Sequence, residues 1–134
     1  MFCSIARDEL AAPVVYRDER VLAFLDHRPL FPGHTLLIPR DHHQTLADLP
    51  DALLEPLFSA TRTLARAVQH AMGAQGSFVA MNNVVSQSVP HLHVHIVPRR
   101  SKDGLRGFFW PRTKYANDAH VEQVRAAIAE ALAD

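Results

Sequence analysis

The sequence predicts an α+β fold with a mostly antiparallel five-stranded sheet, one long helix and a second helix at the C-terminus. Short apolar segments follow one another closely before residue 40, separated only by polar or proline-rich turns, which favours strands that pair with their neighbours. One long segment with helical spacing interrupts the strands, and no linker, repeat or low-complexity tract divides the chain. We therefore expect one domain over residues 1–134.

Three strands joined by tight turns are predicted at the N-terminal end. Residues 14–16 and 21–25 are apolar and flank the polar turn 17–20. The segment RPLFPG then forms a turn that ends at Gly33 and leads into the strand HTLLIP. Pro39 ends this strand, because proline has no amide hydrogen to donate to a neighbouring strand.

A long helix is expected from about Asp51 to Met72, where apolar residues recur at helical spacing. Gly73 is well placed to end it. Pro56 lies inside this range, so the helix either begins near Glu55 or bends at the proline. The segment SFVAMNN that follows is predicted to be the fourth strand.

The C-terminal part combines an amphipathic helix with an aromatic segment. The helix begins near Asn117 or Asp118. Its apolar face is formed by Val121, Val124, Ile128 and Leu132. Before it, residues 107–112 read GFFWPR, and no single strand or helix buries three adjacent large rings on one face. We therefore expect part of this segment to need a second surface, such as a partner chain.

The charge balance, the cysteine content and the length of the apolar runs argue against several classes of protein. The chain has 14 basic and 14 acidic residues, so its net charge gives no reason to expect nucleic acid or a membrane as a partner. The single cysteine, Cys3, excludes an internal disulfide and fits a reducing compartment. No apolar run is long enough for a signal peptide or a membrane span, so we expect a cytoplasmic protein.

The fifth predicted strand contains the strongest signal, HLHVHIV, with His91, His93 and His95 at alternate positions. Alternate residues of a strand share one face, so one face carries imidazoles and the other carries aliphatic side chains. Solvated histidines without chemistry are one interpretation, but three on one strand face are an unlikely accident. A metal site is another, yet the first and last would lie roughly 13 Å apart along a strand. Phosphate chemistry is favoured, because imidazole is a good nucleophile near neutral pH and spaced imidazoles match a phosphate chain.

HLHVHIV resembles the signature of the histidine triad (HIT) superfamily, including its Hint-like and Fhit-like nucleotide hydrolases. VLAFLDHRPLFPGHTLLIPRDH and SQSVPHLHVH are similar to two further blocks of that family, and they occur in the family's order. The resemblance implies a HIT-like fold and a hydrolase or nucleotidyl transferase that cleaves at the α-phosphate of a nucleoside phosphoramidate or a (di)nucleoside polyphosphate. It also implies a nucleotide substrate with a purine base (adenosine), a homodimer and no cofactor.

The resemblance also implies a role for individual residues. His93 would be the nucleophile that forms a covalent nucleotidyl-histidine, and His95 would contact the α-phosphate and protonate the leaving group. His91 and His34 would hold the reacting groups in place. The substrate-binding positions would be Asp26 for the ribose hydroxyls, Asn83, Gln87 and Ser88 for the phosphates, Phe2, Ile5, Phe24 and His27 for the base, and Trp110 beside the partner's pocket.

The sequence departs from the family pattern at three places, and these departures limit which residue roles can be carried over from the family. His27 stands where an aliphatic side chain is usual, which leaves the base preference open. Residues 84–86 read VVS where glycines are frequent, so fewer backbone donors are expected to face the phosphates. Some relatives bind zinc through two N-terminal cysteines and histidines; since only Cys3 is present, we expect no metal here, and His42 is expected in a solvated turn.

The sequence leaves open two other kinds of protein and several leaving groups. A nucleotide-binding sensor that has lost turnover and, with less support, a metal-dependent enzyme are compatible with the pattern. An amine, a second nucleotide, a sugar phosphate or an inorganic anion would each serve as the leaving group.

Overall fold

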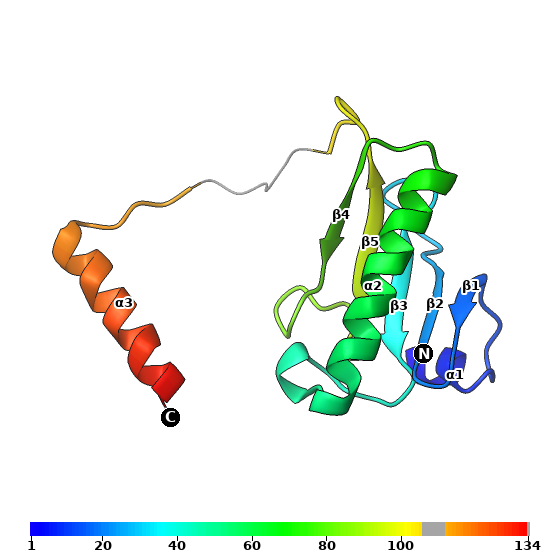
Figure 1. The fold of residues 1–134 in the computed structure, drawn as a ribbon, viewed down its shortest axis with the longest axis horizontal. Helices are drawn as coiled ribbons and strands as arrows, with labels where there is room; N and C mark the ends of the chain where they lie inside the picture. Colours follow the sequence, from blue (N-terminus) through cyan, green and yellow to red (C-terminus); the bar gives the residue numbers. More distant parts are fainter. Residues whose placement is uncertain (106–111, 134) are drawn as a thin grey trace. The chain divides into compact units, whose positions relative to one another are not determined.

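The computed structural model describes residues 1–105 and 112–133. The chain divides into two compact units, Met1–Asp103 and Gly104–Asp134, and each is described by itself. The first contains the sheet with α1, α2 and a short 3-10 helix, and the second contains α3 (Figure 1). The expectation of one domain over the whole chain stays a prediction.

The sheet of the first unit has the order β1-β2-β3-β5-β4, and all neighbouring strands are antiparallel. The strands are β1 Val14–Arg17, β2 Val21–Leu25, β3 Thr35–Pro39, β4 Gly76–Ala80 and β5 Val94–Arg99. The predicted α+β class with a five-stranded antiparallel sheet is confirmed.

One face of the sheet is covered by α2, Asp51–Ala71 (Figure 1). Its buried Leu57, Leu64 and Val68 pack in one cluster with apolar side chains of β2, β3 and β5. The helix runs through Pro56, so the alternative start near Glu55 is wrong. Gly73, with a φ of +59°, follows the helix end, as the sequence predicted.

The other face carries α1, Phe2–Ala6, which the sequence did not predict. Its Phe2 and Ile5 pack in a second cluster with side chains of β2 and β3. Alternation along the extended chain divides the two faces: Leu92, Val94 and Ile96 belong to the α2 cluster. The histidines between them therefore point to the α1 side.

Two predicted strands are shorter than expected. β5 begins at Val94, so His95 lies in the strand while His91 and His93 precede it. The prediction of three histidines on one regular strand is therefore wrong, although the alternation holds. Pairing explains the boundary, because the register of β3 with β5 ends at the Leu37–Val94 pair. β4 ends at Ala80, and the remaining residues of SFVAMNN leave the sheet.

Gly33 shapes the turn before β3. Its φ is +98°, and a Cβ there would lie 2.7 Å from Met72 Cγ. This position therefore requires glycine. The turn delivers His34, which is buried, to the start of β3.

α3, Asp118–Ala133, forms the described helix of the second unit, and the Asn117 side-chain oxygen accepts the His120 amide at its start. Its predicted apolar face is present at helical spacing, but Val121, Ile128 and Leu132 are exposed. Within the part of the chain that the structure describes, no helix is both long and apolar enough to cross a membrane.

Candidate active site

A cavity of about 360 Å³ lies on the α1 face of the sheet. Apolar side chains of α1, of residues 10–13 and of β2 form much of its wall, including Phe2, Ile5 and Phe24. The polar residues that line it are Asp26, His27, Ser88, His93 and His95. The structure thus brings eight of the predicted site residues into one cavity, while their roles stay predictions.

His93 is oriented by the backbone. Its Nδ1 lies 2.7 Å from the carbonyl oxygen of His91, which only accepts, so Nδ1 carries a proton and donates. In a neutral ring this leaves the lone pair on Nε2. The rings of Phe2 and His93 also pack in a T-shaped arrangement, with centroids 5.1 Å apart. His93 therefore has a fixed ring plane and a nucleophilic Nε2.

A chain of hydrogen bonds sets the tautomers of His34 and His95. The Leu30 amide donates to His34 Nδ1 over 3.1 Å, so the proton of a neutral His34 lies on Nε2. His34 Nε2 lies 2.9 Å from His95 Nδ1 and donates to it. His95 therefore carries its own proton on Nε2, as a phosphate donor requires.

Burial lowers the pKa values of both imidazoles. Burial is the main reason that the pKa of His34 lies below its ordinary value, with Asp26 opposing it. The pKa of His95 falls to about 4, because of burial first and then repulsion from His93 and His34. Both rings are neutral near pH 7, which is consistent with the tautomers derived from the hydrogen bonds.

This hydrogen-bond chain argues against a cation at Asp26, His34 and His95, although their ligand atoms all lie within 4.8 Å of one another. The nitrogen that His34 turns toward the other two is protonated, because Leu30 occupies its Nδ1. A protonated nitrogen has no lone pair for a metal. The arrangement suits an anion better, which weakens the metal-dependent alternative at these residues.

Asp26 follows β2 at the mouth of the cavity. Its Oδ1 accepts the Arg28 amide over 2.9 Å, and its Oδ2 lies 3.8 Å from His34 Nε2. Its own amide donates to the His34 carbonyl over 2.9 Å, which ties the end of β2 to the start of β3. The carboxylate is thus held in place with acceptor capacity left for a ligand. His27 beside it is exposed.

Asn83 and Gln87 stabilise a loop instead of lining the cavity. Asn83 Oδ1 accepts the Leu46 amide over 2.7 Å. The Gln87 side-chain amide donates to the Gln44 carbonyl over 2.6 Å, and its oxygen accepts the Val84 amide over 3.3 Å. Their phosphate-binding roles stay predictions, and in this structure both side chains hold the loop to residues 44–46.

The loop backbone is strained where the sequence lacks glycine. Val84 has a φ of 68° and Ser86 a φ of 62°. A β-branched residue such as valine is rarely found in this left-handed region. The departure from glycine noted in the sequence therefore has a conformational cost here.

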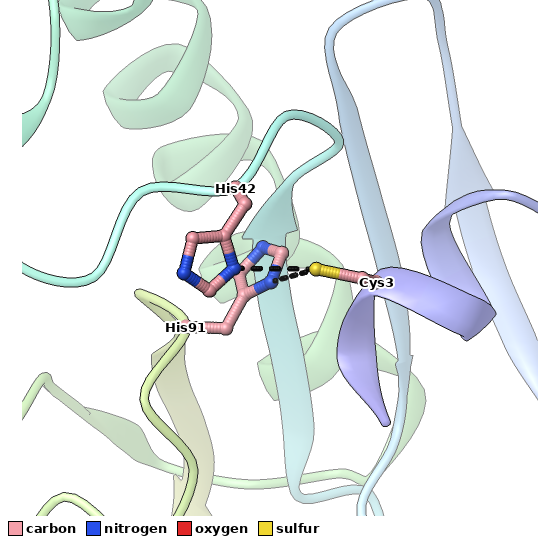
Figure 2. A group of neighbouring side chains, drawn as sticks. All are labelled: Cys3, His42 and His91. Carbon is pink, nitrogen blue, oxygen red and sulfur yellow. Dashed lines mark hydrogen bonds between the residues drawn. The ribbon is translucent and has the colours of Figure 1, made fainter.

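Cys3, His42 and His91 form a second group, which the sequence did not predict (Figure 2). Cys3 Sγ lies 3.2 Å from His42 Nδ1 and 3.4 Å from His91 Nδ1. His91 is buried, and burial lowers its pKa. His42 is exposed and lies outside the helices and strands, as the sequence predicted, and its ring contacts Cys3. A cysteine 39 and 88 positions from the two histidines gives no local signal in sequence.

Trp110 and its aromatic neighbours lie outside the described residues. The predictions that concern them are therefore untested.

Comparison with known proteins identifies the family. A model of the HIT domain matches residues 7–102. The chain belongs to the HIT family. A crystal structure of a HIT family protein from Bacillus subtilis superposes with a TM-score of 0.87 and 33% identity, covering 97% of this chain and 94% of that one.

Two HIT relatives carry names that describe an activity. An adenylylsulfatase from Arabidopsis thaliana, HINT3, is 34% identical over 78% of this chain and 54% of its own length. A bis(5'-nucleosyl)-tetraphosphatase from Schizosaccharomyces pombe is 34% identical over 70% of this chain and 53% of its own length. In broad terms, then, this HIT protein is a nucleotide-binding hydrolase or transferase.

Proposed function

We propose that the protein binds a nucleoside 5′-phosphate derivative in the cavity and cleaves the bond between its α-phosphorus and the leaving group through a nucleotidyl-His93 intermediate. The observation that carries this proposal is the complementary state of two adjacent rings. His93 presents a lone pair on Nε2 and His95 a proton on Nε2, with ring centroids 4.9 Å apart. A nucleophile beside a hydrogen-bond donor is what phosphoryl substitution needs.

The chemistry divides into two displacements. His93 Nε2 attacks the α-phosphorus, a P–N bond forms and the bond to the leaving group breaks. The His91 carbonyl stabilises the positive charge that develops on the His93 ring, through the 2.7 Å hydrogen bond from Nδ1. The Nε2–H of His95 passes its proton to the leaving group as that bond breaks, while the His34 N–H bonded to His95 Nδ1 stabilises the ring that has lost it. Water attacks the phosphoramidate, returns a proton to His95 and releases the mononucleotide.

The cavity fits a nucleoside. Phe2, Ile5 and Phe24 offer an apolar wall for a purine base, and the Asp26 carboxylate suits a pair of ribose hydroxyls. The names of the Arabidopsis and yeast relatives support substrates in which an adenylyl or nucleosyl group is joined to a second group. We place adenosine phosphoramidates and dinucleoside polyphosphates in this class.

A covalent adduct tests the mechanism. The protein is mixed with adenosine 5′-phosphoramidate or diadenosine tetraphosphate, quenched without acid and digested, and the peptide containing His93 is examined for an adenylyl group by mass spectrometry. We expect the adduct in the wild type, its loss in His93→Ala and a smaller loss of turnover in His91→Ala. The His43→Ala variant is the matched control, because His43 does not line the cavity and its backbone carbonyl, which accepts the Leu92 amide, is kept in the variant. Normal turnover in His93→Ala would overturn the mechanism, and tight AMP binding without turnover in the wild type would favour the sensor alternative.

We propose a homodimer with Trp110 near the partner's pocket and a cytoplasmic location. The exposed apolar face of α3 and the three adjacent aromatic residues support an intermolecular surface. The single cysteine supports a reducing compartment. Light scattering should report twice the 15.0 kDa chain mass, and Trp110→Ala should impair substrate selectivity more than folding. A fully active monomer would contradict the assembly.

A further inference from the structure

The guanidinium of Arg40, the residue that follows β3, joins three separate segments of the first unit. Its Nε and one terminal nitrogen lie 3.2 and 2.9 Å from the Ala6 carbonyl oxygen, at the end of α1, and donate to it. The same terminal nitrogen lies 3.4 Å from the Asp8 carboxylate. The other terminal nitrogen donates to the Asp18 carbonyl, in the turn between β1 and β2, over 2.9 Å. One side chain therefore ties the end of α1 to the sheet.

The last carbonyl of α1 is paired with this side chain. The final carbonyls of a helix have no partner within the helix and must find one elsewhere. Backbone amides of the residues that follow α1 donate to the carbonyls of Cys3, Ser4 and Ile5. The Ala6 carbonyl accepts the Arg40 N–H groups, and Ala6 is buried. Removing the guanidinium would thus leave a buried acceptor without these donors, and a helix of five residues has little stability of its own to offset the loss.

The segment that Arg40 holds is one wall of the proposed nucleotide cavity. Phe2 and Ile5 of α1 line the cavity, and residues 10–13 line it further along the chain. The ring of Phe2 also packs against that of His93. The contacts of the guanidinium with this segment lie between these two parts of the wall. Arg40 is not among the residues that line the cavity, so it acts on the cavity through the wall.

The contacts depend on the shape of arginine as well as on its charge. A guanidinium is planar and has five N–H donors in fixed directions, whereas a lysine ammonium is a single point of charge. The Ala6 and Asp18 carbonyls accept from different nitrogens of the group. A lysine at this position would keep a positive charge near Asp8 but would not reproduce both carbonyl contacts. The substitution of Arg40 by lysine is therefore a mild and specific way to release α1.

We propose that Arg40 is a positioning residue for nucleotide binding: it keeps α1 and residues 7–13 against the sheet and thereby sets the affinity of the cavity for the nucleoside. The nature of the ligand rests on the proposed function, whereas the docking of α1 by Arg40 does not. The hydrogen bond that orients the nucleophile, from His93 Nδ1 to the His91 carbonyl, does not involve this side chain. Loss of the guanidinium should therefore weaken binding far more than it slows the chemical step.

Binding and turnover of Arg40→Lys test this role, with Arg17→Ala as the matched control. Arg17 pairs with the same Asp8 carboxylate over 3.0 Å, but the two side chains are 47% and 48% exposed, so this pair contributes little. If α1 is docked in about a tenth of the Arg40→Lys molecules, the Kd for AMP rises about 10-fold. We expect a rise of about 5- to 20-fold in this Kd and in KM for adenosine 5′-phosphoramidate, with kcat within about twofold of the wild type. Arg17→Ala should stay within about twofold of the wild type in all three quantities.

Amide hydrogen exchange separates this positioning role from a general loss of structure. In Arg40→Lys the amides of α1 and of the turn after it should exchange faster, whereas those of β5 should keep their protection. Wild-type AMP affinity in Arg40→Lys, or a fall in kcat as large as the rise in Kd, would overturn the proposal. Loss of protection in β5 would also overturn it, because Arg40 would then stabilise the whole fold. A wild type that neither binds AMP nor turns over the phosphoramidate would contradict the proposed function, and exchange at α1 would still decide whether Arg40 holds the helix.

Discussion

Replacing His34 tests whether the hydrogen-bond chain from Leu30 to His95 supports catalysis. In His34→Ala, the 2.9 Å hydrogen bond to His95 Nδ1 is lost, and the Leu30 amide loses its acceptor. A hydrogen bond of this kind contributes about 0.5–1.5 kcal/mol, and loss of ring orientation adds to it. We therefore expect kcat to fall by about 5- to 30-fold. KM should change little, because His34 is not among the residues that line the cavity.

A second readout separates this positioning role from a general structural role. The pKa of His95 is about 4 because the ring is buried and lies beside His93 and His34. Removing His34 admits water and removes one repelling imidazole, so the pKa should rise toward its ordinary value of 6.5. NMR titration of the His95 ring measures this shift directly. His34→Gln, whose side-chain amide can still donate to His95, should recover part of kcat.

An exposed histidine on the other face of the sheet provides the control. His70→Ala removes an exposed imidazole from α2, on the opposite face of the sheet, and should leave kcat and the His95 titration unchanged. If His34→Ala keeps kcat within about twofold of the wild type and the His95 pKa stays near 4, the tautomer argument is wrong.

Three further predictions concern acid stability, loop strain and metal removal. The pKa values of His34, His91 and His95 are lowered in the folded state, so the unfolded chain binds more protons below pH 6.5. The free energy of unfolding should therefore fall as the pH drops through 6.5, and the contribution of His95 to this fall should end near pH 4. The loss should be at least ~1 kcal/mol after allowing for solvent screening, and denaturant unfolding at pH 7 and 5 measures it; equal stability at both values would contradict it. Val84→Gly relieves a valine at a φ of 68° and should raise Tm by calorimetry, with Val85→Gly, whose φ is not positive, as the control that does not gain. Chelation should leave turnover of a phosphoramidate unchanged; a loss of activity that zinc restores would favour a metal-dependent mechanism.

The sequence by itself determined the features that depend on neighbours along the chain. Alternation of histidine with leucine, valine and isoleucine after Pro90 put imidazoles and core side chains on opposite faces, because successive residues of an extended chain point in opposite directions. Helical spacing identified α2, and its glycine stop was visible because few other residues adopt a positive φ readily. The quoted motifs identified the family for the same reason, since each motif is contiguous.

Strand ends depended on pairing partners rather than on residue type. Nothing in HLHVHIV distinguishes His93 from His95, yet only His95 lies opposite Leu36 of β3 and Ala80 of β4. In the same way β4 ends at Ala80, and Asn83 beyond it accepts the Leu46 amide, a contact across 37 positions. A register of this kind is set by packing of the whole sheet and is not encoded in a local pattern.

Tertiary structure alone decided which histidines meet and which tautomers they adopt. His34 and His95 meet across 61 positions, and the tautomers of both follow from the Leu30 amide in the turn before β3. Cys3 meets His42 and His91 because α1 packs on the histidine face, and α1 forms because Phe2 and Ile5 find apolar partners on β2 and β3. A five-residue helix has too little intrinsic stability to be predicted from its own sequence, so these contacts exist only once the sheet is assembled.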